Sequence, residues 1–299
     1  MTVRSKRKKK YPDKDRLLKI LKVIFVIVWF ILGLCRDQFF VEQYGNVEEV
    51  EYSFHFPDVG EGDCTIIASE EYCVMVDTGS RKGEYISGEY ARSLADKVDC
   101  LVLTHPHEDH MGAMLNLMEV IEVETIMVPD IKATTPQYEY YLNDAMEKGV
   151  KIETANVGGI YSFGDITLQI LGPLVEDESN VNNSSIVVRA VTEDVSVMIT
   201  GDIERKAEML LLGKYSDAAL KSDILKVAHH GSATSSSEQF LDTVSPTYAV
   251  ISCEWDNYYE HPSEQTLTRL KYRGIEYFIT FEHGHVVFVS DGKNIALAQ

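Results

Sequence analysis

The sequence predicts an α/β domain in which two β-sheets are covered by helices on the outside, preceded by one N-terminal hydrophobic helix. Short runs of β-branched and aromatic residues alternate with helical patterns from residue 51 to the C-terminus. The early runs form hairpin-like pairs, whereas helical stretches separate the later ones. A composition of 45% hydrophobic and 25% charged residues excludes collagen-like, low-complexity and wholly disordered chains.

The first 50 residues divide into a basic tail (1–16), a hydrophobic segment (17–35) and an acidic linker (36–50). The 13 residues of 23–35 carry no charge, a length between that of a signal-peptide core (about 7–15) and a spanning helix (about 20). Because the segment lacks a small-residue cleavage site, we expect a single-pass transmembrane anchor, with secretion after cleavage as the alternative. The basic residues before it predict a cytoplasmic N-terminus and an extracellular domain over 51–299.

Charge is distributed unevenly along the chain. Its 28 basic and 47 acidic residues give a net charge of −19, and the first 22 positions hold ten of the basic residues and two of the acidic ones. The remaining residues therefore carry 18 basic and 45 acidic side chains, a net charge of −27. Such a surface repels polyanions at long range, which excludes a broad basic nucleic-acid footprint. A polyanionic substrate would need something other than Lys and Arg to supply positive charge.

Strands are predicted where β-branched and aromatic residues cluster: 51–56, 64–68, 72–76, 100–104, 125–128, 166–171, 185–191, 195–200, 224–228, 248–252, 277–280 and 286–290. Helices are predicted where the pattern turns helical: 84–97, 111–120, 137–148, 203–212, 236–244 and 263–272. The run from Ser235 to Glu238 is typical of a capping box, and His261-Pro262 before Ser263 marks the start of the last helix.

A dense group of metal-binding residue types follows the predicted strand 100–104. The string is His105-Pro-His107-Glu-Asp109-His110. Two histidines separated by one residue in extended backbone point the same way, while Asp109 and His110 come after the chain has turned. Imidazoles and carboxylates are ligands for divalent metals, so one loop can serve two adjacent ions. A polar surface loop without an ion is the alternative.

Two further strand ends carry matching residues. Asp202 follows the predicted strand 195–200, and His229 and His230 follow the predicted strand 224–228. Alone, an Asp before a helix is more often an N-cap, and one histidine pair is unremarkable. Their occurrence together with the first cluster, each at the carboxyl end of a strand, favours a metal site.

These motifs together resemble the metallo-β-lactamase fold superfamily, with Asp77-Thr-Gly79 before the histidine cluster and Asp202 and His230 after it. The following strings also resemble the hydrolase domain of ComEC-type competence proteins and its free-standing relatives: Asp58-Val-Gly-Glu-Gly-Asp63, Asn183-Ser-Ser-Ile-Val-Val188, Thr200-Gly-Asp-Ile-Glu204, Leu225-Lys-Val-Ala-His-His-Gly-Ser232 and Asn257-Tyr-Tyr-Glu-His-Pro262. The resemblance covers residue 51 to the C-terminus. It implies a four-layer αββα sandwich with a two-metal site along one edge.

The resemblance also implies a role for each site residue. The first metal would be held by His105 and His107, the second by Asp109 and His110, with Asp202 bridging and His230 as the last ligand. The residues expected to support these ligands from behind are Asp77, Asp58 and Asp63. Many members have a third histidine on the first metal, yet no histidine occurs between His110 and His229 here. Asn182 or Asn183 lies near that place, and Asn183 is the predicted ligand; with fewer nitrogen donors, we expect Mn²⁺ to compete with Zn²⁺.

Two divalent ions suit displacement at phosphorus. The predicted function is therefore a phosphodiesterase or nuclease acting outside the membrane, with single-stranded DNA as the substrate that the resemblance implies. The alternatives are a cell-wall phosphodiesterase acting on choline or teichoic-acid diesters and a non-catalytic, metal-stabilised surface binding module. No stable protein partner is predicted.

The remaining site predictions concern catalysis and substrate binding. Asp109 or Asp202 would orient the nucleophile, and His229 or His261 would protonate the leaving oxygen. The hydroxyls of Ser232 and Thr234 would bind phosphate beside a helix N-terminus, although helix capping explains them nearly as well. Five tyrosines either line a base-stacking groove or, as the simpler interpretation, are ordinary exposed tyrosines of helices and loops: Tyr138, Tyr140, Tyr141, Tyr258 and Tyr259.

Overall fold

The structure is a computed structural model that describes residues 47, 49–132 and 134–298. These belong to one unit of the chain, residues 46–299. The predicted basic tail and hydrophobic segment lie outside the described residues, as does nearly all of the linker, so the membrane anchor and its orientation stay predictions. In the described ranges, no helix has the length and apolarity that a membrane span requires.

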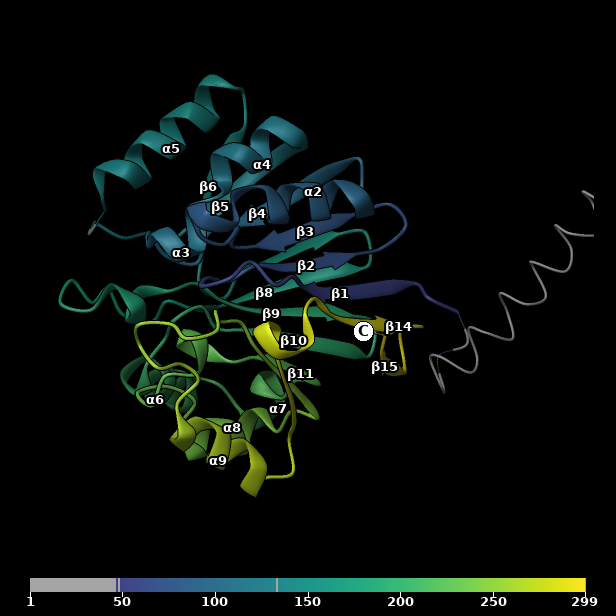
Figure 1. The fold of residues 1–299 in the computed structure, drawn as a ribbon, viewed down its shortest axis with the longest axis vertical. Coiled ribbons are helices and arrows are strands. Elements are labelled where there is room, and N and C mark those ends of the chain that lie inside the picture. Colours follow the sequence, from purple (N-terminus) through teal and green to yellow (C-terminus); the bar gives the residue numbers. More distant parts are fainter. Residues whose placement is uncertain (1–46, 48, 133, 299) are drawn as a thin grey trace, which may run out of the picture. The chain divides into compact units, whose positions relative to one another are not determined.

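Two β-sheets form the centre of this unit (Figure 1). The first sheet has the order β15-β14-β1-β2-β3-β4-β5-β6 and comprises β1 (Tyr52–Phe56), β2 (Thr65–Ala68), β3 (Cys73–Val76), β4 (Lys97–Val102), β5 (Glu122–Val128), β6 (Lys151–Thr154), β14 (Val286–Ser290) and β15 (Ile295–Leu297). The second has the order β13-β12-β11-β10-β9-β8-β7 and comprises β7 (Ile160–Phe163), β8 (Ile166–Gly172), β9 (Val187–Thr192), β10 (Val195–Ile199), β11 (Ile224–Lys226), β12 (Tyr248–Ile251) and β13 (Glu276–Ile279).

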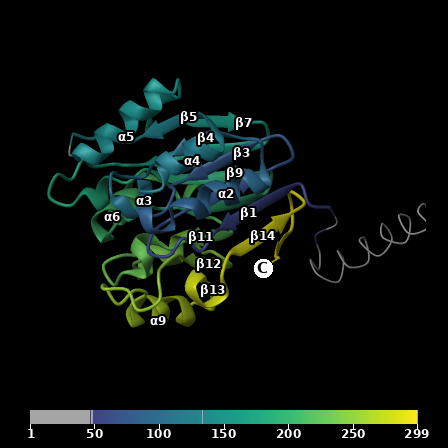
Figure 2. The ribbon, with the colours of Figure 1, turned by 45° about the horizontal axis from the view of Figure 1, so that its top comes forward.

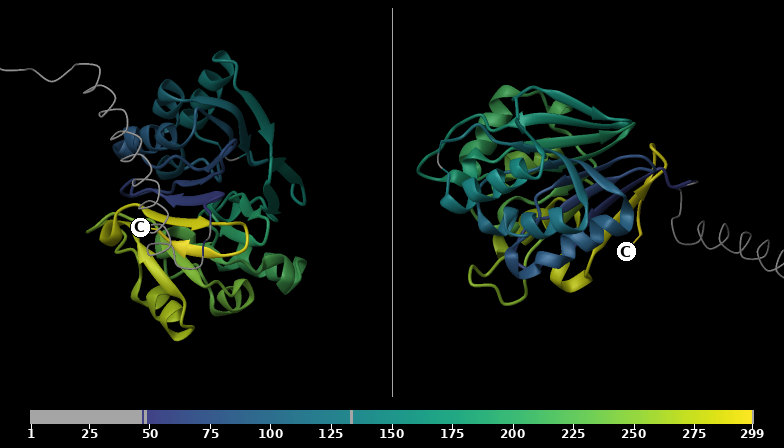
Figure 3. Two further views of the ribbon diagram at one scale, coloured as in Figure 1. Left: turned by 90° about the vertical axis from the view of Figure 1, so that its right-hand side faces the viewer. Right: turned by 90° about the horizontal axis from the view of Figure 1, so that it is seen from above.

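Helices cover the outer face of each sheet (Figure 3). The first sheet is covered by α2 (Glu84–Leu94), α4 (Met114–Val120) and α5 (Pro136–Glu147), and the second by α6 (Arg205–Lys214), α8 (Glu238–Val244) and α9 (Glu264–Tyr272). Three shorter helices are α3 (Glu108–Met111), α7 (Asp217–Leu220) and α10 (Thr280–His283). The expected αββα layering of residues 51–299 is therefore confirmed.

The main core lies between the two sheets. Phe54 and Val102 of the first sheet pack in one buried cluster with Val197 and Ile224 of the second. Further cores lie between each sheet and its own helices. Because the central strands are buried on both faces, their sequences are nearly continuous apolar runs, such as Cys73–Val76. This burial makes the strand ends rigid platforms for the loops that follow them.

The carboxyl ends of β4, β10 and β11 meet at one edge of the sandwich. The amide of Ile186 donates to the carbonyl of Thr104 (2.9 Å), which ties the two sheets together there. At this crossing Gly201 has a φ of +52°, and a Cβ on it would lie 2.9 Å from the Cβ of Ser185. Glycine is therefore required where the chain leaves β10 toward Asp202. Figures 1 and 2 show α3 and α6 at this end, away from the C-terminus.

Candidate metal centre

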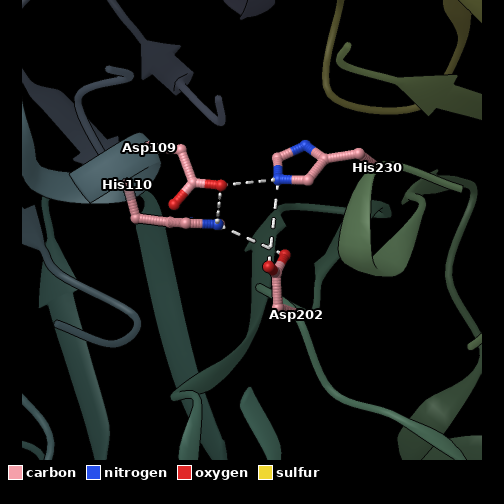
Figure 4. A group of neighbouring side chains, drawn as sticks. All are labelled: Asp109, His110, Asp202 and His230. Atoms are coloured by element: carbon pink, nitrogen blue, oxygen red, sulfur yellow. Dashed lines mark hydrogen bonds and ion pairs between the residues drawn. The ribbon is translucent and has the colours of Figure 1, made fainter. Parts of the chain in front are cut away.

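Three loops bring six acidic and imidazole side chains together at this edge. Two groups, each with ligand atoms within 4.8 Å of one another, are formed by His105, His107 and Asp202 and by Asp109, His110, Asp202 and His230. Asp202 belongs to both groups. Figure 4 shows the four residues of the second group pointing toward one another from separate segments of the chain. The structure thus brings together every predicted ligand except Asn183.

The first group is held from behind by hydroxyls. Thr104 Oγ1 donates to Asp77, so it accepts from His105 Nδ1, which lies 3.1 Å away. His105 Nε2 is thereby free to face His107 Nδ1 at 3.0 Å and Asp202 Oδ2 at 3.8 Å. Burial lowers the pKa of His105 well below its usual range and also lowers the pKa of His107. Both rings are therefore neutral at pH 7, the form that binds metals.

The second group is oriented in the same way. His110 Nδ1 donates to Asp77 Oδ2 (2.7 Å), and Asp77 in turn accepts from the amide and hydroxyl of Thr104. His230 Nδ1 donates to the carbonyl of Ser252 (2.9 Å). Each imidazole consequently presents Nε2 to the centre of the group, as the outer partners of metal-bound histidines do. The prediction that Asp77 supports a ligand agrees with this geometry.

Two buried atoms at the centre have no hydrogen-bond partner among the residues that the structure describes. His110 Nε2 and Asp202 Oδ1 lie 3.3 Å apart, and both side chains are almost fully buried. Orphaned polar atoms are costly in a protein interior unless something else satisfies them. A divalent cation between these atoms would do so, and a set of imidazoles and carboxylates without sulfur suits Zn²⁺ or Mn²⁺. The residues therefore fit a metal centre.

The charges agree with this interpretation. Burial disfavours a proton on His110 and His230, yet the Asp202 carboxylate beside both raises the pKa of each well above its usual value. Although burial acts in the opposite direction, the same two imidazoles lower the pKa of Asp202 well below its usual value. Protons on the two rings can thus balance buried negative charge. A bound cation would take the place of those protons.

His229 and His230 both adopt left-handed backbone conformations, with φ of 51° and 52°. Such conformations are unfavourable for histidine and are found mainly where a site imposes them. The turn directs His230 inward to Asp109, with Nε2 3.2 Å from Oδ2. His229 faces the cavity instead, with Nδ1 3.6 Å from Glu204 Oε1 and Nε2 3.3 Å from the amide nitrogen of Asn182. The geometry places His230 in the metal group and His229 beside it.

A cavity of about 520 Å³ opens over the two groups. Its lining comprises Glu61, Ser80, Lys82, His107, Glu108, Asp109, Asn182, Asp202, His229, His230, Tyr259 and His261. A larger cavity of about 730 Å³ lies where β1 begins and β2 ends, but neither histidine nor cysteine lines it. The smaller cavity is therefore the candidate for catalysis, because it alone of the two combines imidazoles with carboxylates.

Asn183, the asparagine predicted as a ligand, lies outside the two groups of candidate ligands. Its amide nitrogen donates to Asp177 (3.2 Å) and its amide oxygen accepts from the amide of Glu204 (3.1 Å). Both polar atoms of the Asn183 side chain therefore form hydrogen bonds with residues outside the two groups. The neighbouring Asn182 lines the cavity, and its buried Oδ1 has no hydrogen-bond partner. Of the two asparagines, Asn182 is therefore the one that faces the site.

Three other predicted residues also have different positions. Asp58 accepts from the amide of Gly60 (3.2 Å) and so stabilises a turn rather than a ligand. The hydroxyls of Ser232 and Thr234 form a hydrogen bond with each other (2.9 Å), and neither residue lines the cavity. The predicted capping box is shifted as well, because Ser237 rather than Ser235 accepts from the helix amide. Phosphate binding by Ser232 and Thr234 therefore has no support in this geometry.

Sequence reasoning missed a buried ion pair behind the site. Lys226 of β11 is fully buried, and its Nζ lies 2.6 and 2.7 Å from the two carboxylate oxygens of Asp63. Asp63 Oδ1 also lies 3.3 Å from His230 Nδ1, in agreement with its predicted supporting role. Burial raises the pKa of Asp63, but Lys226 and His230 together lower it to about 2. Asp63 therefore keeps a carboxylate charge against the inner side of His230 at neutral pH.

Comparison with known protein families gives a match over the part of the chain that contains these candidate ligands. The family model of the metallo-beta-lactamase superfamily matches residues 57–255. The chain belongs to this superfamily. It is 30% identical over 250 residues to ComE operon protein 3 of Bacillus subtilis, covering 77% of this chain and 32% of that protein. It is 29% identical over 244 residues to competence protein ComA of Neisseria gonorrhoeae, covering 81% and 33%. The chain thus spans about a third of the length of these relatives.

Solved structures support the fold. The metallo-beta-lactamase fold protein YhfI from Bacillus subtilis aligns with a TM-score of 0.55 at 14% identity, over 80% of this chain and all of that one. CmlA, a diiron beta-hydroxylase from Streptomyces venezuelae, aligns with a TM-score of 0.53 at 14% identity, over 77% of this chain and 52% of that one. Identities this low show a shared architecture only.

Proposed function

We propose that the chain is a two-metal-dependent hydrolase that cleaves phosphodiester bonds in single-stranded DNA. The observation that carries the proposal is Asp202, a buried carboxylate shared by two groups of donors beneath an open cavity. Similarity to proteins named for competence supports DNA as the substrate class. In this proposal His105 and His107 bind one cation and the other group binds the second.

Two divalent cations bound by these residues would supply Lewis acidity and lower the pKa of a bound water. The chain's own residues then orient the reactants. Asp109 lines the cavity with a partly exposed carboxylate, so it is placed to accept a proton from an attacking water. Asn182 presents an amide to the same space and can hold a phosphoryl oxygen.

Of the two predicted proton donors, His229 has the better environment. Burial lowers the pKa of His261 to about 4, so that ring is neutral at pH 7 and holds no readily released proton. His229 Nδ1 faces Glu204 Oε1 at 3.6 Å, and a carboxylate in this position orients the imidazole ring toward the cavity. We therefore assign protonation of the leaving oxygen to His229 and a positioning role to His261.

Activity and metal dependence test the proposal together. The full chain, loaded with Mn²⁺ or with Zn²⁺, is offered single-stranded DNA, bis-p-nitrophenyl phosphate, a phosphocholine diester and a chromogenic lactam. We expect cleavage of the first two, greater with Mn²⁺, and a loss of at least about 100-fold in Asp202→Asn. Asp96→Asn, which neutralises an exposed carboxylate, is the matched control and should retain full activity. A chain that binds both metals and cleaves none of these substrates would instead indicate a binding module.

A further inference from the structure

The loop after β12 exposes three large aromatic side chains. Tyr258 is 92% exposed, Trp255 73% and Tyr259 67%. Tyr259 also lines the cavity over the metal groups, together with His261. Several aromatic rings exposed side by side are unfavourable in water unless they have a binding partner. Their position at the cavity makes the substrate the natural candidate for that partner.

The loop is held in a fixed shape rather than left to collapse. Asn257 Nδ2 donates to the carbonyls of Glu254 (2.9 Å) and His261 (2.6 Å), and its Oδ1 accepts from the amide of His261 (2.9 Å). The amide of Glu254 donates to Glu61 Oε2 (3.1 Å). One side chain therefore closes the loop from both ends, and the aromatic rings are presented in advance of binding, which reduces the entropy lost on binding.

The rings form a nearly parallel row that leads outward from the metal groups. His261 lies over His230 with ring centroids 6.3 Å apart and planes 27° apart. Tyr259 lies over His261 at 5.7 Å and 23°. Tyr258 stands edge-on to Tyr259, at 5.3 Å and 84°. A flat ring added beyond Tyr259 would continue the row in the same orientation.

The cavity offers little positive charge to a polyanion. Among its lining residues Lys82 is the one Lys or Arg, and its Nζ lies 3.8 Å from Glu254. Four carboxylates line the same space: Glu61, Glu108, Asp109 and Asp202. Contacts to the phosphate backbone, which usually provide most nucleic-acid affinity, are therefore scarce outside the metals. Stacking on aromatic rings is the other general source of affinity for single strands.

We propose that Tyr259, flanked by Tyr258, stacks a nucleobase next to the scissile phosphate of a single-stranded substrate. This inference rests on the proposed phosphodiesterase function and adds how the strand is held. Stacking requires an unpaired base and tolerates any base, so single strands are cleaved in preference to duplex with little sequence preference. The hydroxyl of Tyr259 is not needed for stacking.

The test compares a normal and a base-free strand of equal length and charge. The full chain with Mn²⁺ is offered oligothymidylate and an otherwise identical abasic oligonucleotide, and kcat and KM for cleavage are measured. The same measurements are made on the variants Tyr259→Leu, Tyr259→Phe and Tyr258→Leu. For Tyr259→Leu we expect KM for oligothymidylate to rise about tenfold, with kcat and the abasic substrate nearly unchanged. Tyr259→Phe should behave like the native chain. Tyr272→Leu removes a tyrosine of α9 that is 87% exposed and does not line the cavity, and is the matched control.

The outcomes separate this inference from the proposed function. If Tyr259→Leu loses cleavage efficiency equally on both oligonucleotides, Tyr259 only supports the loop. If it loses none on either, Tyr259 does not contact the substrate. Both results overturn the inference and leave the proposed nuclease function intact. Loss confined to a phosphocholine diester would show that the rings bind a quaternary ammonium group, which also overturns it. A native chain that cleaves neither strand would refute the proposed function itself.

Discussion

Replacement of Lys226 by Met is predicted to destabilise the protein strongly at neutral pH. Lys226 Nζ is fully buried with both oxygens of Asp63 within 2.7 Å, and it also donates to the carbonyl of Val227 at 3.1 Å. Met has a similar volume but leaves the buried Asp63 carboxylate without its cation. Removal of one partner from such a pair costs about 3–5 kcal/mol in unfolding free energy.

The pKa of Asp63 gives a second route to the magnitude. Lys226 and His230 outweigh burial and hold it at about 2 instead of 3.8, which corresponds to roughly 2–3 kcal/mol of stability at pH 7. Because the folded-state pKa lies below the unfolded one, this contribution is complete above about pH 4. It is lost as pH falls from about 4 to about 2. The first route gives about 3–5 kcal/mol and the second roughly 2–3 kcal/mol, so we expect Lys226→Met to lose about 2–5 kcal/mol.

Urea unfolding of the full chain at pH 7 in chelator measures this effect, since bound metal would add its own stabilisation. The control is the double variant Lys226→Met/Asp63→Asn, in which no uncompensated charge is left. We expect the double variant to recover at least about half of the loss, because the cost arises mainly from the unpaired carboxylate. A double variant as unstable as Lys226→Met, or a Lys226→Met change below about 1 kcal/mol, would refute the reasoning.

Three further predictions concern the ligand supports, a glycine and a buried histidine. Asp77→Asn should weaken metal binding about 10–100-fold in a competition titration, because Asp77 orients His110; unchanged affinity would contradict this role. Gly62→Ala should lower the melting temperature by several degrees, since its Cβ would lie 2.4 Å from the carbonyl oxygen of Asp109 where φ is +146°; an unchanged melting temperature would show that this loop is free to move. Burial lowers the pKa of His55 to about 4, so the free energy of unfolding should fall as pH drops from about 6.5 to 4. Urea unfolding at several pH values should show a weaker pH dependence in His55→Gln than in the native chain. An equal pH dependence in both would exclude His55 as its source.

The sequence predicted the central strands well and the edge strands poorly. Strands buried on both faces, such as β3 and β4, are continuous apolar runs that stand out from their surroundings. The three unpredicted strands, β6, β7 and β15, each lie at an edge of a sheet, where polar residues and partial exposure are tolerated. Such short segments carry too weak a pattern to be distinguished from loops.

The site was predictable where its residues follow strands and less so elsewhere. His105, Asp202 and His230 each come shortly after a strand, so the parallel arrangement brings them to one edge. Asn182 and Asn183 lie in a 3₁₀ turn, in which successive side chains point about 120° apart, and the sequence does not tell which one faces inward. Lys226 resembles an exposed strand lysine until the fold shows Asp63, distant in sequence, beside it.

Spin coupling between bound manganese ions tests the shared carboxylate most directly. The full chain is freed of metal, loaded with Mn²⁺ and studied by electron paramagnetic resonance together with metal analysis. We predict two ions per chain and the spectrum of an exchange-coupled pair, lost in Asp202→Asn and retained in Asp96→Asn. A single ion, or two ions with uncoupled spectra in the native chain, would contradict a two-metal centre bridged by Asp202.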